Sequence, residues 1–255
     1  MSREALQIAA AAGFAAVAVA AAWALRLGLS RELAWAALRA AVQLTAVGAL
    51  ITLVFHVEVL AIAFVAAMVT TAALTSGGRL RVVPGARRRV AVAIGVPALA
   101  AVGLLLAIGA FAATPRAAVP TAGILIGGAM TAATITGRRL LESLEHDEGE
   151  IEARLSLGDD AATALRPVLR RAVTSGLVPV IDQTRSVGIV TLPGTFVGLV
   201  LGGASPAAAA RVQLLVLLSL LAVELFSSLI VGRLLLAAVI APGERVEFDP
   251  HPPRA

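Results

Sequence analysis

The chain alternates long apolar segments with short polar stretches from its first residues almost to its last. A helix needs about 20 apolar residues to cross the hydrocarbon core of a bilayer. Six segments are long and apolar enough for this, and a seventh is broken. The pattern therefore predicts an all-α fold, a polytopic transmembrane helix bundle of about seven spans. The expected spans are residues 5–25, 33–54, 57–75, 90–112, 119–137, 177–204 and 207–240.

The arginines predict how these spans are oriented. Cytoplasmic flanks of transmembrane helices carry an excess of basic residues. If the N-terminus lies outside, the outer side keeps only Arg3, Arg116 and Arg211, and the inner loops hold most of the others. We therefore expect the N-terminus outside, the C-terminus inside and a transmembrane domain over residues 1–240. The polar, proline-rich end, residues 241–255, is expected to be a disordered cytoplasmic tail.

A polar arm, about residues 138–175, separates the fifth and sixth expected spans and would lie on the cytoplasmic side. Ile151 and Leu155 are four residues apart, so a helix places them on one face and leaves charged residues on the others. Gly158 then interrupts the helical pattern. The arm is therefore expected to contain one amphipathic helix that ends at a glycine turn.

A second, short helix is expected after the glycine, over residues 161–166. Asp159 or Asp160 can cap it, and Pro167 either ends it or begins the next helix. A short helix held between two flanking helices can fit a groove on a partner protein. The alternative interpretation is that the arm is only a solvated connector between two spans.

Composition removes several classes of function. The chain has no cysteine, which excludes a disulfide, a thiolate metal site and a cysteine nucleophile. All 21 basic residues are arginine, and without lysine the phosphate-binding loop GxxxxGK[ST] cannot be present. The arginines cluster at the ends of apolar segments and aromatic residues are scarce, so nucleic-acid binding is not expected. The histidines share no motif with a second ligand, so no dedicated histidine metal site is expected.

The most specific motif begins in the sixth expected span. The stretch LVPVIDQTRSVGIVTLPGTFVGLVLGGASPAAAARVQLLV, residues 177–216, fits the pattern PxID…VGxVxLPGxxxGxxLxGxxPxxAxxxQ. With this pattern the chain closely resembles the bacterial iron-export ABC permease family, whose plant relatives are tied to aluminium tolerance. LRAAVQL, IGGAM, GRRL and EIEARLSLG fit the family as well, in matching order, so the resemblance covers most of residues 33–231. The matching residues are Pro179, Ile181, Asp182, Val187, Gly188, Leu192, Pro193, Gly194, Gly198, Gly202, Pro206 and Gln213.

The resemblance implies a permease subunit that exports iron or another metal cation across the bacterial inner (plasma) membrane. It also implies a homodimer that binds two copies of a separate ABC ATPase. ATP and Mg²⁺ would belong to that partner, so this chain is expected to bind no cofactor and to be no enzyme. The arm would then carry the coupling helix that docks on the ATPase. We expect this coupling role for Glu152, Ala153, Gly158, Asp159, Asp160 and Leu165.

Ionisable residues at membrane depth are candidates for the transport path, because unpaired charge in hydrocarbon is costly. Asp182 and Arg185, three residues apart on one helix face, either neutralise each other or contact the substrate or a gate. Glu224 stands where the family pattern has a small residue, and it is either a hard-oxygen ligand for a metal cation or hydrogen-bonded to another span. Ala133 stands where the pattern has asparagine, and both departures put the identity of the substrate in doubt.

Three uncharged residues are further candidates for the path. Pro193 removes a backbone donor and, with Gly194, loosens the sixth span, giving either a packing kink or a hinge that lines the path. Gln43 shares one face of the second span with Arg39 and either bridges helices or lines the path.

Three other functions stay open. An ABC permease for an organic molecule or a sugar nucleotide would have the same architecture. A proton-coupled secondary carrier would use Asp182 and Glu224 as relays and would need no ATPase. A non-transporting scaffold would recruit partners through its tail, although a scaffold has no need of charge inside the membrane.

Overall fold

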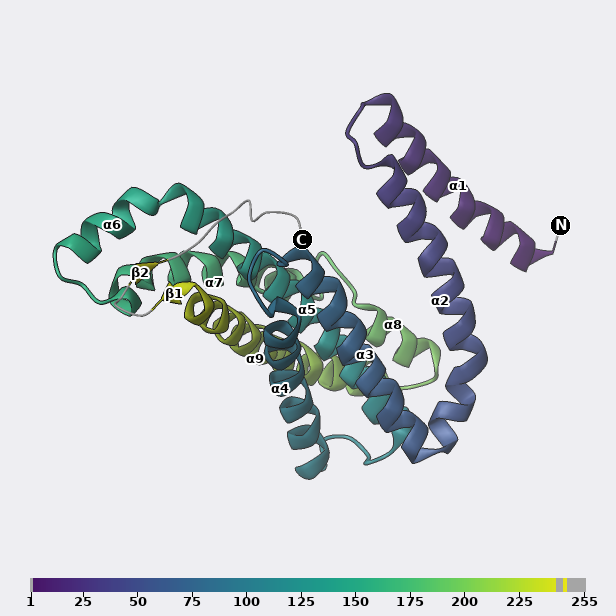
Figure 1. Ribbon diagram of the computed structural model, residues 1–255. Coiled ribbons are helices and arrows are strands. Elements are labelled where there is room, and N and C mark those ends of the chain that lie inside the picture. Colours follow the sequence, from purple (N-terminus) through teal and green to yellow (C-terminus); the bar gives the residue numbers. More distant parts are fainter. Residues whose placement is uncertain (1, 242–244, 247–255) are drawn as a thin grey trace. The chain divides into compact units, whose positions relative to one another are not determined.

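The computed structural model describes residues 2–241 and 245–246, and most of them are helical (Figure 1). Within these residues, α1–α5 and α9 are long and apolar enough to cross a membrane. The predicted polytopic helical architecture is confirmed at this level, and most of the predicted tail lies outside the described residues. The elements are α1 (Arg3–Ala24), α2 (Ser30–His56), α3 (Glu58–Arg79), α4 (Ala86–Ala107), α5 (Pro115–His146), α6 (Glu148–Ser156), α7 (Ala161–Ser186), α8 (Gly194–Leu201), α9 (Pro206–Val239), β1 (Ile240–Ala241) and β2 (Arg245–Val246).

Contacts between the helices divide the chain into two units, residues 1–58 and 59–255. In the first unit α1 packs against α2. Ser2 caps α1, because its hydroxyl oxygen accepts a hydrogen bond from the Ala5 N–H. Ala22 and Val54 are buried in this unit, whereas most of its other apolar side chains are exposed. Helices that expose apolar side chains along their whole length are suited to lipid rather than to water.

The second unit is built around α5 and α9, which pack against each other and against α4 and α7 (Figure 1). Small residues bring these helices close together, as is usual between helices in membranes. A Cβ atom added to Gly137 of α5, for example, would lie 2.5 Å from Leu80 Cδ1 and 3.3 Å from Leu235 Cδ1, and the first distance is too short for a side chain. The largest fully buried apolar side chains of the unit include Leu80, Ile94, Leu125, Leu140, Leu165, Leu217 and Leu235.

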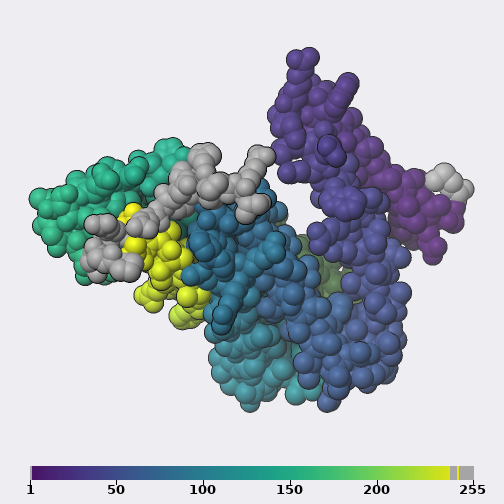
Figure 2. All heavy atoms as spheres, viewed as in Figure 1, coloured from purple at the N-terminus to yellow at the C-terminus, as the bar shows by residue number. Residues whose placement is uncertain are grey.

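The polar arm, residues 138–175, is formed by the end of α5, all of α6 and the beginning of α7. Figure 2 shows its teal-green atoms beside the yellow end of α9. α5 continues past the expected end of the fifth span as far as His146, and Asp147 separates it from α6. The apolar face predicted for α6 is confirmed at Ile151, which is buried in the core cluster with Leu155 packed against that cluster.

The prediction of a separate short helix over residues 161–166 is wrong. These residues form the first turns of α7, which continues through Pro167 to Ser186. A proline inside a helix removes one hydrogen bond and crowds the preceding turn. Leu165 and Val168 lie on either side of Pro167 and are buried in the core, and this packing holds the helix together across the missing bond. The arm is therefore a helical hairpin whose returning helix continues into the bundle.

The sixth expected span, residues 177–204, is divided between two helices. α7 ends at Ser186, and the backbone turns sharply before α8 begins after Pro193. Gly188 has φ 83°, and its N–H donates to the Thr191 carbonyl oxygen at 2.8 Å, closing the turn. Glycine adopts this left-handed conformation at little cost. The interruption therefore starts at the glycine turn, ahead of the proline from which it was predicted.

Candidate functional site

The tip of the arm is the turn between α6 and α7, residues 157–160. Gly158 has φ 97°, a conformation that L side chains rarely adopt. Its N–H donates to the Leu155 carbonyl oxygen at 3.0 Å, and the Asp159 N–H donates to that of Arg154 at 3.1 Å. These bonds satisfy carbonyl groups at the end of α6. Leu157, which the sequence did not single out, is 88% exposed at this tip.

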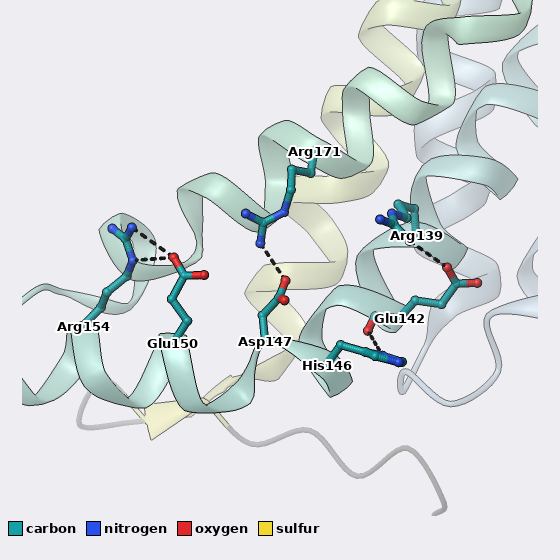
Figure 3. A network of polar contacts seen from close by, with 7 residues as sticks. All are labelled: Arg139, Glu142, His146, Asp147, Glu150, Arg154 and Arg171. Atoms are coloured by element: carbon teal, nitrogen blue, oxygen red, sulfur yellow. Dashed lines mark hydrogen bonds and ion pairs between the residues drawn. The ribbon is translucent and has the colours of Figure 1, made fainter.

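Packing and one ion pair connect the two helices of the arm. Ile151 of α6 is 4% exposed and Leu165 of α7 is 0% exposed, and both belong to the apolar core. Arg171 of α7 donates to the carboxylate of Asp147, just before α6, at an N–O distance of 2.6 Å (Figure 3). An exposed ion pair contributes only about 0–1 kcal/mol. The buried leucine and isoleucine therefore anchor the arm, and the ion pair sets the approach of its helices.

The remaining ion pairs are local to α5 and to α6 with the turn that follows it. They join residues three to five positions apart, so they stiffen one helix and its turn rather than link separate helices. Among the described residues they are Arg139–Glu142 at 3.5 Å and Arg154–Glu150 at 3.1 Å, both drawn in Figure 3, and Arg154–Asp159 at 4.0 Å.

Most of the predicted coupling residues lie on the surface of the arm near its tip. The exception is Leu165, whose burial makes it an anchor of α7 and keeps it out of reach of a partner. Asp159 is half-buried beside the turn. The exposed ones are Glu152, Ala153, Gly158 and Asp160.

Asp160 caps α7, and this confirms one of the two predicted caps. Its Oδ1 accepts a hydrogen bond from the backbone N–H of Thr163 at 2.6 Å. Hydrogen bonds from Thr163, first from its side chain and then from its backbone, lower the pKa of the Asp160 carboxyl. The carboxylate form is therefore the better cap, as at other helix N-termini.

Replacing Asp160 by alanine should lower the thermal unfolding midpoint of the purified protein in detergent at pH 7, because the first turn of α7 loses its cap. The folded-state pKa is lowered, so the carboxylate's contribution is fully present above an unfolded-state pKa of about 3.9 and is lost as the pH falls below it. The difference between the two proteins should therefore shrink in acid. Asp159→Ala, which removes no cap, is the matched control. Equal midpoints of Asp160→Ala and the unchanged protein at pH 7 would contradict the prediction.

Only one of the predicted path residues is buried. Asp182 and Arg185 are exposed near the end of α7, and no ion pair joins them in the described part of the chain. Pro193 precedes α8, whose first residue, Gly194, is exposed. Gln43 is exposed in the first unit, where it and Arg39 line a surface hollow along α2. The buried one is Glu224 of α9, which is 5% exposed.

The Glu224 side chain points from α9 toward α5. A Cβ atom added to Gly128 of α5 would lie 2.6 Å from Glu224 Oε1 and 2.4 Å from Leu220 Cδ1, so a side chain at this position would displace both groups. The alternative of a hydrogen bond to another span is not found among the described residues. A buried carboxyl group without such a bond is costly in hydrocarbon, which makes it a candidate for function rather than for packing.

Two more buried polar groups lie nearby. One is on α9, one helical turn after Glu224, and the other is on α5, two turns after Gly128. Thr136 of α5 and Ser228 of α9 are both 0% exposed, and neither hydroxyl has a hydrogen-bond partner among the described residues. A Cβ atom added to Gly176 of α7 would overlap Thr136 Oγ1 and would lie 3.0 Å from Ser228 Oγ. Both hydroxyl groups therefore converge on the backbone of α7 at a residue that has no side chain. We call Thr136, Ser228 and Gly176 the hydroxyl junction.

Sequence reasoning selected Glu224 but did not select the residues of the hydroxyl junction. The signal was present in the spacing, because Ser228 follows Glu224 by four residues and Thr136 follows Gly128 by eight. Each pair lies on one face of its helix. The spacing could not show that these two helix faces pack against each other and that both also contact α7.

The family profile described as "Uncharacterised protein family (UPF0014)" matches residues 5–240. The chain belongs to the UPF0014 family. This UPF0014 chain is 36% identical over 223 residues to UPF0014 membrane protein STAR2 of Oryza sativa subsp. japonica, covering 87% of this chain and 78% of the relative. It is 32% identical over 196 residues to Protein ALUMINUM SENSITIVE 3 of Arabidopsis thaliana, covering 75% and 71%.

A third relative of the UPF0014 chain is the probable iron export permease protein FetB of Escherichia coli (strain K12), 28% identical over 207 residues, covering 80% of each chain. No solved structure matches the chain. The expected relationship to iron-export permeases and their plant relatives is confirmed. With membrane proteins as relatives and several apolar helices of spanning length, the UPF0014 chain is a multi-pass membrane protein.

Proposed function

We propose that this UPF0014 chain is the membrane-spanning permease subunit of an ATP-driven ABC transporter that exports iron or another metal cation. The similarity to a probable iron export permease over 80% of both chains supports the cargo. ATP and Mg²⁺ are bound by a separate ATPase subunit, and this chain is a transport subunit rather than an enzyme. The absence of lysine, and with it of a phosphate-binding loop, agrees with that division of labour.

The geometry of the arm is the observation that carries the ATP-driven part of the proposal. A coupling element must be stiff, must be held at both ends and must present a surface to its partner. The arm has buried anchors on both of its helices, Ile151 and Leu165. Its tip is exposed and carries Leu157, an apolar side chain that nothing covers among the described residues. Because α7 runs without a break from this tip into the core, displacement of the tip moves the bundle.

The membrane topology and assembly follow from the same proposal. The N-terminus lies outside and the arm inside, and the inner half of the sixth span is the end of α7, completed by α8. Residues 1–240 form the permease domain, in the lipid bilayer of the bacterial inner membrane. Two copies of the chain form a homodimer that engages two ATPase subunits, which gives each arm one docking surface.

Reconstitution into liposomes tests the proposal. The chain should be purified together with a separately expressed ABC ATPase subunit, and Fe²⁺ movement should be followed with a metal-sensitive dye. We expect transport only when both subunits and Mg-ATP are present, and none with an ATPase subunit whose catalytic glutamate is replaced. Transport by this chain alone, or failure of the two subunits to associate, would count against the permease assignment.

The burial of Glu224 without a hydrogen bond or ion pair favours one second candidate, a proton-coupled carrier. Such a carrier would move its cargo without an ATPase and in response to a pH gradient. The other expected relay, Asp182, is exposed, which weakens this candidate. The same liposomes separate the two functions, because only a carrier transports when a pH gradient replaces ATP.

A further inference from the structure

Two rows of residues, one on α5 and one on α9, lie side by side along the centre of the second unit. The α5 row is Gly128, Ala132 and Thr136, and the α9 row is Glu224, Ser228 and Gly232, each with a spacing of four. Contacts fix their register. Glu224 Oε1 lies against Gly128, and a Cβ atom added to Gly232 would lie 3.9 Å from Thr136 Cγ2. The two faces therefore stay together over two helical turns.

Three residues of these rows have polar side chains: Glu224, Ser228 and Thr136. We call these three residues the oxygen row. Buried hydroxyl groups nearly always have a hydrogen-bond partner, and in a membrane no water is there to replace one. Serine and threonine within a helix usually donate to the carbonyl four residues back, as Thr131 does to Gly127 at 3.1 Å. Thr136 and Ser228 do not form this bond and face α7 instead.

Some other buried hydroxyl groups of this unit have partners on neighbouring helices. Ser76 of α3 and Thr134 of α5 share a hydrogen bond of 2.7 Å, and Ser227 of α9 donates to the Ala93 carbonyl oxygen at 2.7 Å. The fold can therefore satisfy hydroxyl groups at this depth. Alanine and valine would fill the positions of Ser228 and Thr136 without an unpaired polar atom. The two hydroxyl groups are consequently expected to gain partners in a different state of the protein.

Gly176 closes the oxygen row in the state seen here. The Thr136 and Ser228 hydroxyl groups lie against its backbone, leaving no space for a side chain. Nearer the arm, the Leu169 side chain packs into the space left by Gly232 and seals the row on that side. Gly176 and Leu169 both belong to α7, the helix that starts at the arm's tip. Movement of the arm therefore acts directly on the two residues that shut the row.

We propose that Glu224, Ser228 and Thr136 line the arm-side half of the translocation path for a partly hydrated metal cation, and that α7 opens and closes this half at Gly176. Carboxylate and hydroxyl oxygens suit a hard cation. No group of three or more carboxylate or histidine ligands occurs among the described residues, so the row holds a passing ion weakly enough to release it. The proposal rests on the proposed function and adds the residues of the path and the helix that gates it.

Thiol labelling tests the path directly, because the chain has no cysteine of its own. Single variants Ser228→Cys and Thr136→Cys should be prepared in the complex with the ATPase subunit and treated with a charged methanethiosulfonate reagent. The reagent needs a thiolate in contact with water. Thr131→Cys on α5 is the control, since Thr131 lies exposed on the outer face of its helix and would face lipid. We expect labelling of Ser228→Cys about tenfold faster during ATP turnover than without ATP, and no labelling of Thr131→Cys.

The outcomes separate the path from its energy source. Ser228→Cys and Thr136→Cys that stay unlabelled in a complex that transports would overturn the path. Labelling that requires neither ATP nor the ATPase would support the oxygen row as a path but overturn its gating by α7 and the ATP-driven part of the proposed function. Labelling that appears only during ATP turnover supports both.

A second measurement covers the case in which a cysteine variant does not fold. Thr136→Val and Ser228→Ala remove the unpaired hydroxyl groups and keep the packing, with Thr131→Val as control. If the hydroxyl groups only pack, both variants should transport normally, and the proposal is then wrong. We expect thermal stability that is unchanged or raised, preserved ATP hydrolysis, and Fe²⁺ transport lowered by about fivefold or more, because the ion loses its oxygen ligands.

Discussion

Gly176→Ala should destabilise the protein by about 2–3 kcal/mol, because the new methyl group overlaps Thr136 Oγ1 and comes close to Ser228 Oγ and the Ala132 carbonyl oxygen. The Thr136 side chain can turn away, but the backbone carbonyl 3.1 Å from the added atom cannot. α7 must therefore move away from α5 and α9. The midpoint of thermal unfolding in detergent, followed by circular dichroism, measures the loss.

Gly127→Ala is the matched control for this prediction. Gly127 lies in α5 with nothing within 4 Å of an added Cβ atom. Alanine is favoured over glycine inside a helix by about 1 kcal/mol, so this variant should be as stable as the unchanged protein or more so. If both variants shifted the midpoint equally, the close approach of α7 at Gly176 would be refuted.

Gly158→Val should leave the helices inserted and the ATPase active, yet lower the number of cations moved per ATP by about tenfold, because the turn needs a left-handed backbone that a β-branched residue resists. No atom lies within 4 Å of a Cβ added at Gly158, so the effect comes from the backbone of the turn and not from a clash. Transport and ATP hydrolysis should be measured in the same liposomes. The ratio of the two rates reports coupling.

Gly149→Val supplies the control, since Gly149 also lies in the arm, has equal space and is helical without a positive φ. It should keep a normal ratio of transport to hydrolysis. Gly158→Asn should fall between the two, because asparagine tolerates left-handed backbone better than valine does. A Gly158→Val complex with normal coupling would mean that the turn is not the docking element.

The local features of the fold were predictable from sequence wherever a short-range rule decides them. Apolar length identifies the helices of spanning length other than the divided sixth segment, Gly158 marks the end of α6, and Asp160 caps α7. The rule that a proline ends a helix failed at Pro167. The burial of Leu165 and Val168 stabilises the helix by more than the one missing hydrogen bond costs. That burial depends on α5 and α9, which lie far away in sequence, so no local pattern could reveal it.

Of the residues in the candidate site, the sequence alone could point only to Glu224, the one charged residue among them. Glu224 stands out because its helix is otherwise largely apolar, and the structure shows that its side chain is buried. Thr136 and Ser228 look unremarkable in sequence, since hydroxyl residues within spans usually bond their own helix. Their importance comes from register between helices, which places both hydroxyl groups against Gly176. Predicting that register requires knowing how three helices pack, and neither hydrophobicity nor spacing states it.

α7 is a single lever of 26 residues, and a helix of that length extends about 39 Å. One end protrudes with the arm and the other reaches the turn at Val187, beyond the residues that pack at the centre. A stiff rod turned at one end about its packed middle sweeps its other end in the opposite direction. The far turn and α8 behind it should therefore swing outward when the tip is pushed inward, so that a single tilt exchanges which side of the bundle is open.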